Sequence, residues 1–181
     1  EIVEQWSLAG ATKLKELMLP SSLKEIRMVS IASCDGLQEL VIPDGVHTIE
    51  RFAIESNARL VSLTLGAGLE IFDDKAIYFC DKLTEIYNRS SLRMQTFTME
   101  CSGGVYKEVS VYSDPAESKL KTDENGFVLY RGGASTILVD YVGEATNMLI
   151  VPNGVTEIGE GALTNLTFYL NTVILPESVV K

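Results

Sequence analysis

Residues 37–65 read LQELVIPDGVHTIERFAIESNARLVSLTL and contain one complete repeat unit and the start of the next. The unit has the pattern L-x-x-L-x-I-P-x-x-V-x-x-I, in which Leu37 and Leu40 are answered 23 residues later by Leu60 and Leu63. A fixed period of this size is typical of a solenoid, in which each unit buries its apolar side chains against the next one. The sequence therefore predicts a stack of similar turns.

Each unit opens with alternating apolar residues, which predict a short strand. Leu40 and Ile42 are two positions apart, so both side chains face the core. Pro43 then ends the strand, because a proline cannot donate a hydrogen bond to a continuing ladder. Apolar residues three and six positions after the proline turn inward again. Small Ala53 and Ala76 follow, where we expect a tight helical turn.

The same frame accounts for nearly the whole chain, which we expect to form a single repeat domain over residues 1–181. The predicted repeats are 1–13 (partial), 14–36, 37–59, 60–82, 83–105, 106–145, 146–169 and 170–181 (partial). The chain opens inside a truncated unit at Glu1 and stops abruptly at Lys181, so we read it as a trimmed fragment that more units or another domain would follow.

An insertion interrupts the frame at 116–145. Within it, 123–126 predicts a turn, Phe127 to Tyr130 a short strand, 131–134 a second turn and Thr136 to Tyr141 a partner strand. Two short apolar runs separated by a glycine-containing turn are typical of a β-hairpin. The preceding unit is degenerate as well, because Asn88, Arg89 and Gln95 replace apolar residues and a proline.

Composition limits the classes of partner. The chain has 181 residues, 46% of them hydrophobic, and a formal charge of −10. Nucleic acid and anionic membranes require a basic face, so neither is an expected partner. No apolar run of about 18 residues is present, and we expect no membrane insertion.

The three cysteines do not form the framework of a small disulfide-rich protein. Cys34 and Cys80 share one column of the repeat, with Asn57 between them, and we expect small side chains under a turn with Asn57 bonded to loop backbone. Two stacked strands separate the cysteines by about 10 Å, beyond the roughly 7 Å limit for a disulfide. A Cys80–Cys101 bridge is an open alternative.

The side chains expected on the outer face of the strands form two rows. One row is acidic and reads Glu16, Glu39, Ser62, Glu85 and Glu108. The row beside it is partly apolar and reads Met18, Val41, Thr64, Tyr87, Ser110, Ile150 and Ile174. Solenoids use such a face for binding, so the predicted partner-binding residues are Glu16, Glu39, Val41, Glu85, Tyr87 and Glu108. The alternative interpretation is a solvated face without a partner.

Catalytic chemistry has little support in the sequence. His47 is the only histidine and lies in the turn that begins at Asp44, where an exposed polar residue is expected. No nucleophile is marked out by its neighbours, and no phosphate loop, zinc spacing or calcium loop is present. We therefore expect no enzyme activity, no cofactor and no metal.

The units resemble the BspA-like leucine-rich repeat family of bacterial surface proteins. The resemblance rests on L-x-x-L-x-I-P-x-x-V-x-x-I-x-x-x-A at 37–53, on the related pattern at 151–162 and on A-x-x-x-C-x-x-L at 76–83. The N-G-x-x-L-Y hairpin at 125–130 is also familiar in that family. The resemblance implies a leucine-rich-repeat solenoid, mainly β with short helical turns, whose parallel strands stack at a 23-residue period around one inserted β-hairpin.

The same resemblance implies a role. Such proteins are secreted or anchored on bacterial surfaces, are not enzymes and bind host or bacterial proteins. We accordingly expect an extracellular binding or adhesion module that contacts a protein through the concave strand face. Two alternatives are a structural spacer that displays other domains and a carbohydrate-binding module that uses Tyr87, Tyr106, Tyr112 and Tyr130 for stacking.

Overall fold

The computed structural model describes residues 1–166 and 169–180, which group into two compact units, Glu1–Glu117 and Ser118–Lys181. Each unit has a hydrophobic core of its own. Two cores differ from the one continuous core expected of a single repeat domain. That residues 1–181 form a single domain stays a prediction.

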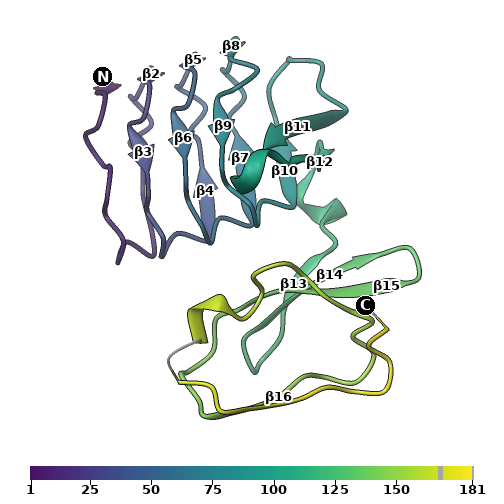
Figure 1. The fold of residues 1–181 in the computed structure, drawn as a ribbon. Helices are drawn as coiled ribbons and strands as arrows, with labels where there is room; N and C mark the ends of the chain where they lie inside the picture. The colour runs from purple at the N-terminus through teal and green to yellow at the C-terminus, as the bar shows by residue number, and fades with distance from the viewer. Residues whose placement is uncertain (167–168, 181) are drawn as a thin grey trace. The chain divides into compact units, whose positions relative to one another are not determined.

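The unit Glu1–Glu117 is a coil whose successive turns lie side by side (Figure 1). Its strands form three sheets. The first sheet runs β1 (Ile2–Val3), β2 (Glu25–Ile26), β5 (Thr48–Ile49), β8 (Ile71–Phe72). The second runs β3 (Ile31–Ala32), β6 (Ile54–Glu55), β9 (Ile77–Tyr78). The third runs β4 (Glu39–Val41), β7 (Ser62–Leu65), β10 (Glu85–Asn88), β12 (Tyr106–Tyr112), β11 (Thr96–Glu100).

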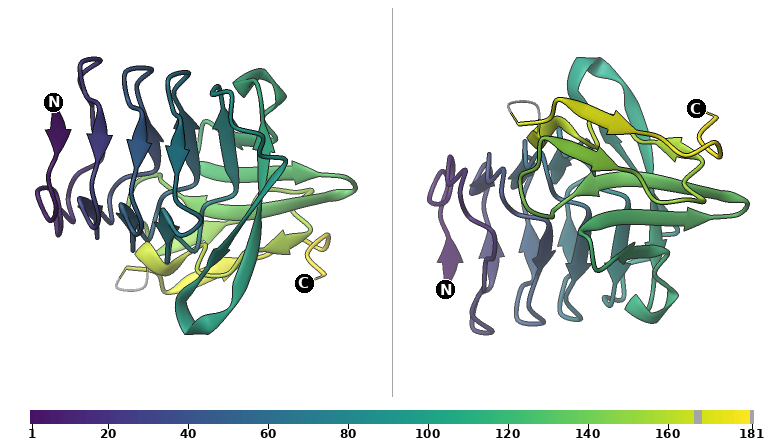
Figure 2. Two further views of the ribbon diagram at one scale, coloured as in Figure 1. Left: turned by 90° about the horizontal axis from the view of Figure 1, so that it is seen from above. Right: turned by 90° about the horizontal axis from the view of Figure 1, so that it is seen from below.

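The register of these sheets confirms the repeat and its frame. Ile26 pairs with Ile49 and Ile49 with Phe72, always in parallel and always 23 residues apart. Leu40 pairs in the same way with Leu63. The aliphatic columns fill the space between the three sheets, and many of their side chains are fully buried. The left view of Figure 2 shows these turns in chain order. The chain is a β-solenoid, as the sequence predicted.

The expected helical turns at Ala53 and Ala76 are wrong. These alanines lead directly into β6 and β9, and the helical elements of the described residues are three short 3₁₀ turns: η1 (Ser102–Gly104), η2 (Pro115–Glu117) and η3 (Thr164–Leu166). Instead, single residues with positive φ bend the chain at the corners, for example Val29 at 56° and Phe52 at 56°. A left-handed residue redirects the backbone in one step, at a cost of roughly 1–2 kcal/mol for a residue other than glycine.

The fourth turn departs from the repeat. β11 runs antiparallel to β12 instead of continuing the coil. As a result Glu85 of β10 pairs with Ser110 of β12, a separation of 110 − 85 = 25 residues rather than 23. The chain thus inserts two residues and folds back on itself. Phe97 and Met99 of β11 join the core and cover its end.

The unit Ser118–Lys181 contains the inserted hairpin and the resumed repeat. β14 (Phe127–Gly132) pairs antiparallel with β15 (Ser135–Tyr141), which confirms the predicted hairpin, and β13 (Leu120–Thr122) adds a third strand. β15 also pairs in parallel with β17 (Glu157–Ile158). The resumed repeat pairs β16 (Met148–Ile150) with β18 (Thr172–Ile174), with Met148 opposite Thr172.

One buried hydroxyl yields a stability prediction. Ser30 is fully buried, and its Oγ has no hydrogen-bond partner among the described residues. Alanine fills the same column at Ala53 and Ala76. We expect Ser30→Ala to raise the free energy of unfolding by about 1 kcal/mol, because an unpaired buried hydroxyl is destabilising. Urea unfolding followed by circular dichroism measures it. Ser7→Ala, at the exposed member of the column, is the matched control and should change little.

Candidate functional site

The N-terminal part of the predicted binding face is accessible. Glu39 and Val41 lie on β4 with exposed side chains, and Val41 keeps 53% of its surface. Glu16 and Met18 precede them by one turn and are exposed too, Met18 at 85%. An exposed apolar residue beside an exposed acid therefore occurs in two successive turns. We call Glu16, Met18, Glu39 and Val41 the acidic–apolar face.

The middle of the predicted rows is buried. Glu85 has no exposed surface and Tyr87 retains 7%, although both lie on β10 at the expected positions. The Tyr87 hydroxyl donates a hydrogen bond to the Glu85 carboxylate. The ring of Tyr87 also lies 6.4 Å, centroid to centroid, from that of Tyr112. These two predicted binding residues are thus not on the accessible surface of this structure.

Glu108 is not in the acidic row, and this part of the prediction is wrong. In the third sheet the residue opposite Glu85 is Ser110, and Tyr112 stands opposite Tyr87. Glu108 instead pairs with Thr98 in the antiparallel ladder of β11 and β12. The two residues that the fourth turn adds have moved Glu108 out of register. A frame read from the sequence could not detect this shift, because the leucine spacing continues unchanged as far as Leu83.

The column of Cys34, Asn57 and Cys80 forms a buried polar ladder. Each of these side chains reaches a backbone oxygen 26 residues earlier in the chain: Cys34 Sγ lies 3.3 Å from Leu8 O, Asn57 Nδ2 3.0 Å from Ile31 O and Cys80 Sγ 3.7 Å from Ile54 O. Asn57 Oδ1 also accepts from the Cys34 backbone N–H at 2.9 Å. Asn57 therefore bonds to loop backbone, as the sequence suggested, but the ladder through the two thiols was not anticipated.

All three cysteines are free and buried, so the Cys80–Cys101 bridge left open by the sequence is not formed. Burial raises the pKa of Cys34 and raises that of Cys80 to about 12. A thiol with a raised pKa is protonated at neutral pH and is a poor nucleophile. These cysteines consequently serve the packing of the turns.

The raised pKa of Cys80 predicts a pH effect on stability. Its ordinary value is 9.0, so above pH 9 the unfolded chain loses the thiol proton while the folded chain keeps it to about pH 12. Stability is thus fully present below pH 9 and falls between pH 9 and 12, by about 1.4 kcal/mol per pH unit from this group. Urea midpoints measured across that range should fall less steeply for Cys80→Ala. Equal slopes in the two proteins would contradict the assignment.

His47 has a structural position in its turn. Its Nδ1 lies 2.9 Å from the carbonyl oxygen of Gly68 in the next turn and 4.0 Å from a carboxylate oxygen of Glu70. A Cβ atom on Gly68 would lie only 2.1 Å from the Asp44 carbonyl oxygen, so the two turns approach closely here. This geometry agrees with the exposed polar turn residue expected from the sequence.

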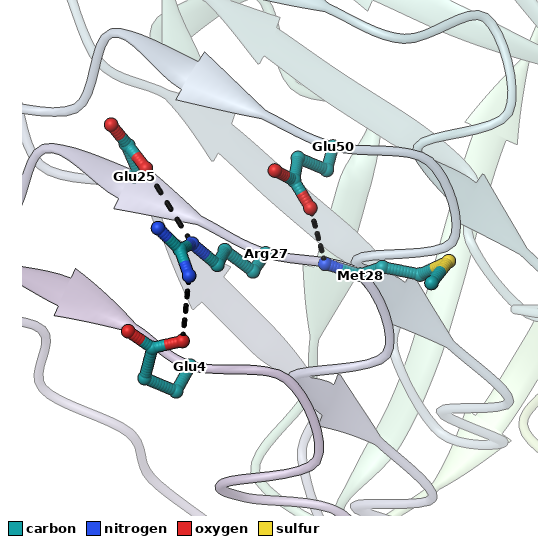
Figure 3. A network of polar contacts seen from close by, with 5 residues as sticks. All are labelled: Glu4, Glu25, Arg27, Met28 and Glu50. Atoms are coloured by element: carbon teal, nitrogen blue, oxygen red, sulfur yellow. Dashed lines mark hydrogen bonds and ion pairs between the residues drawn. The ribbon is translucent and has the colours of Figure 1, made fainter.

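Charged side chains join neighbouring turns along one edge of the first sheet (Figure 3). Arg27 reaches Glu4 in the preceding turn at 2.9 Å and Glu25 at 3.6 Å. The Glu50 carboxylate in the following turn accepts from the Met28 backbone N–H at 2.9 Å. Exposed ion pairs contribute roughly 0.2–1 kcal/mol each. This network therefore aligns the turns and adds little to stability, and sequence reasoning missed it.

The interrupted fourth turn leaves an open groove of about 1090 Å³ within the first unit. Its lining is mixed, with Phe72 and Phe97 beside Asn88, Arg93 and Gln95. Asn88 and Gln95 are among the residues that break the repeat pattern in the sequence. The groove therefore marks the position where the regular coil ends.

Neither a metal cluster nor a membrane helix occurs in the described part of the chain. Over residues 1–166 and 169–180, no three His, Cys, Asp or Glu side chains gather so that they could hold a metal ion. Within the same ranges no helix is long and apolar enough to cross a membrane.

Comparison with known proteins gives one match. Residues 1–101 match the family described as BspA type Leucine rich repeat region, in six copies. Searches of curated proteins and of solved structures returned no match. The matched range ends where β11 closes the first core.

Proposed function

Because the chain belongs to the BspA-type leucine-rich repeat family, we propose that it is a non-catalytic protein-binding module of a bacterial surface protein, acting outside the cell. The family supports a repeat protein used for protein interaction or surface display. Adhesion through a defined face is the finer part of the proposal.

The acidic–apolar face is the observation that carries this proposal. Glu16 and Glu39 are one turn apart, as are Met18 and Val41, and all four side chains are exposed. Adjacent strands of a sheet lie about 4.8 Å apart, so acid and apolar groups recur at a spacing that one partner surface can span. The expected partner is a protein with a basic and partly apolar surface, because opposite charge speeds association and apolar contact slows dissociation.

The experiment compares binding of the full chain and of a charge-reversed form. Purified bacterial surface and extracellular-matrix proteins would be screened by biolayer interferometry at two salt concentrations. For a true partner, we expect Glu16→Lys with Glu39→Lys to weaken binding at least 10-fold, mostly through slower association. The matched control is Glu70→Lys, which reverses an exposed carboxylate after the third-sheet strand has ended. If both forms capture every partner equally, the face assignment is wrong.

A carbohydrate-binding module has less support. Of the tyrosines that could stack on sugars, Tyr87 is buried, whereas Tyr106 is 66% exposed. Sugar recognition in that mode needs an accessible ring, so the described surface favours a protein partner. A spacer function would leave the acidic–apolar face without a ligand, and the same binding screen separates it from adhesion.

A further inference from the structure

Strand β16 has one edge that no neighbouring strand covers. Its sheet contains only β16 and β18 among the described residues. The Thr172 N–H donates to Asn147 O at 3.0 Å, and the Val151 N–H donates to Ile174 O at 2.9 Å. In a parallel ladder alternate residues of a strand bond to a given neighbour. The backbone N–H and C=O of Ile150 therefore point to the opposite edge.

A groove of about 580 Å³ runs along this edge. It is lined by three consecutive residues of β16, Met148, Leu149 and Ile150. Side chains of successive strand residues point to opposite faces, so the edge is the part of the strand that presents all three together. The far wall includes Asp123 and Tyr141, from the two ends of the inserted hairpin. The groove thus occupies the place beside β16 where a further strand would lie.

The chemistry of the groove is apolar with an acidic rim. Met148 is 50% exposed and Ile150 58%. Asp123 and Glu144 supply carboxylates, and no lysine or arginine lines the groove. Tyr141 is only 7% exposed and stacks edge-on against Phe127. The rings of this groove consequently offer no open platform for a sugar, whereas a free strand edge offers main-chain hydrogen bonds to a peptide.

We propose that the free edge of β16 is a strand-addition site for an extended peptide segment of a partner protein, with alternate apolar side chains and at least one lysine or arginine. Main-chain hydrogen bonds supply affinity in this mode of recognition, and pockets for alternate side chains supply specificity. Apolar residues of the segment pack on Met148 and Ile150, and its cation faces Asp123 and Glu144. This site is separate from the acidic–apolar face and does not depend on it.

The test uses the full chain and a capped synthetic peptide that alternates valine with threonine and lysine. Two further peptides serve as probes: one with N-methyl groups on alternate backbone nitrogens, and one with glutamate in place of lysine. We expect the first to bind, to shift the Ile150 amide resonance and to slow its hydrogen exchange. The N-methylated peptide should lose at least 10-fold in affinity, because it cannot form the ladder. The glutamate peptide should bind more weakly at low salt.

Two protein variants isolate the backbone donor. Ile150→Pro removes the N–H that points away from β18 and leaves the bonds to β18 intact, so affinity should fall at least 10-fold. Ile150→Thr keeps the N–H and should bind within about threefold of the parent. Equal binding of the N-methylated peptide, or an unchanged Ile150 amide at saturation, would overturn the proposal. So would self-association of the chain that Ile150→Pro abolishes, since the occupant would then be a second copy.

Discussion

Asn57→Ala is expected to lower the free energy of unfolding of the Glu1–Glu117 unit by about 2–4 kcal/mol. Asn57 is fully buried, and its amide pairs with the Cys34 N–H at 2.9 Å and with Ile31 O at 3.0 Å. Alanine leaves both backbone groups buried without those partners, and each unpaired buried group costs roughly 1–3 kcal/mol. Urea unfolding monitored by circular dichroism gives the change.

The column supplies its own control for this prediction. Cysteine occupies the equivalent positions at Cys34 and Cys80, and there a thiol approaches the carbonyl oxygen that the Asn57 amide approaches in its turn. Asn57→Cys should therefore lose about half as much as Asn57→Ala, because the weak S–H donor can still reach Ile31 O. A cysteine variant as unstable as the alanine variant would show that the ladder does not stabilise the stack.

Phe97→Ala is expected to remove about 3 kcal/mol from the same unit. Phe97 is 7% exposed, packs 5.5 Å from the ring of Phe72 and closes the end of the core. Phenylalanine-to-alanine changes in cores cost roughly 3–5 kcal/mol, and the lower value applies because the adjoining groove leaves one side open. Thr98→Ala alters the exposed neighbour on β11 and should change stability by less than about 0.5 kcal/mol.

Hydrogen exchange shows where that loss acts. In a stack of turns, each turn contacts only its neighbours. Phe97→Ala should therefore accelerate exchange in β8, β9 and β10 and leave β2 and β3 nearly unchanged. Uniform acceleration along the stack would mean that β11 does not act as a cap.

Most of the regular coil could be predicted from the sequence, because a fixed period makes every turn repeat the same apolar columns. The core positions of Leu40, Ile49 and Leu63 follow directly from it. The corners could not be predicted, since Val29 and Phe52 adopt positive φ although neither is a residue that favours it. Stacking of adjacent turns overrides the local preference there.

The candidate site was less predictable than the fold. Glu39 and Val41 are exposed on β4, as expected, because they alternate with buried Leu40. Glu108 was misplaced, since the number of residues in an irregular turn fixes register and no periodic signal reports it. The burial of Glu85 was also missed, because alternation assigns a face to a side chain without showing whether that face is covered.

The strict spacing of the turns also bears on how such a chain can change in evolution. Tandem duplication of one whole 23-residue segment within the regular coil would add a turn and repeat every facing residue on its proper side. An insertion of any other length would displace the residues after it. The fourth turn records such an event, since two extra residues put Ser110 where Glu108 would have stood. Growth by copying is thus open to the regular turns, whereas irregular insertions mark where the array stops.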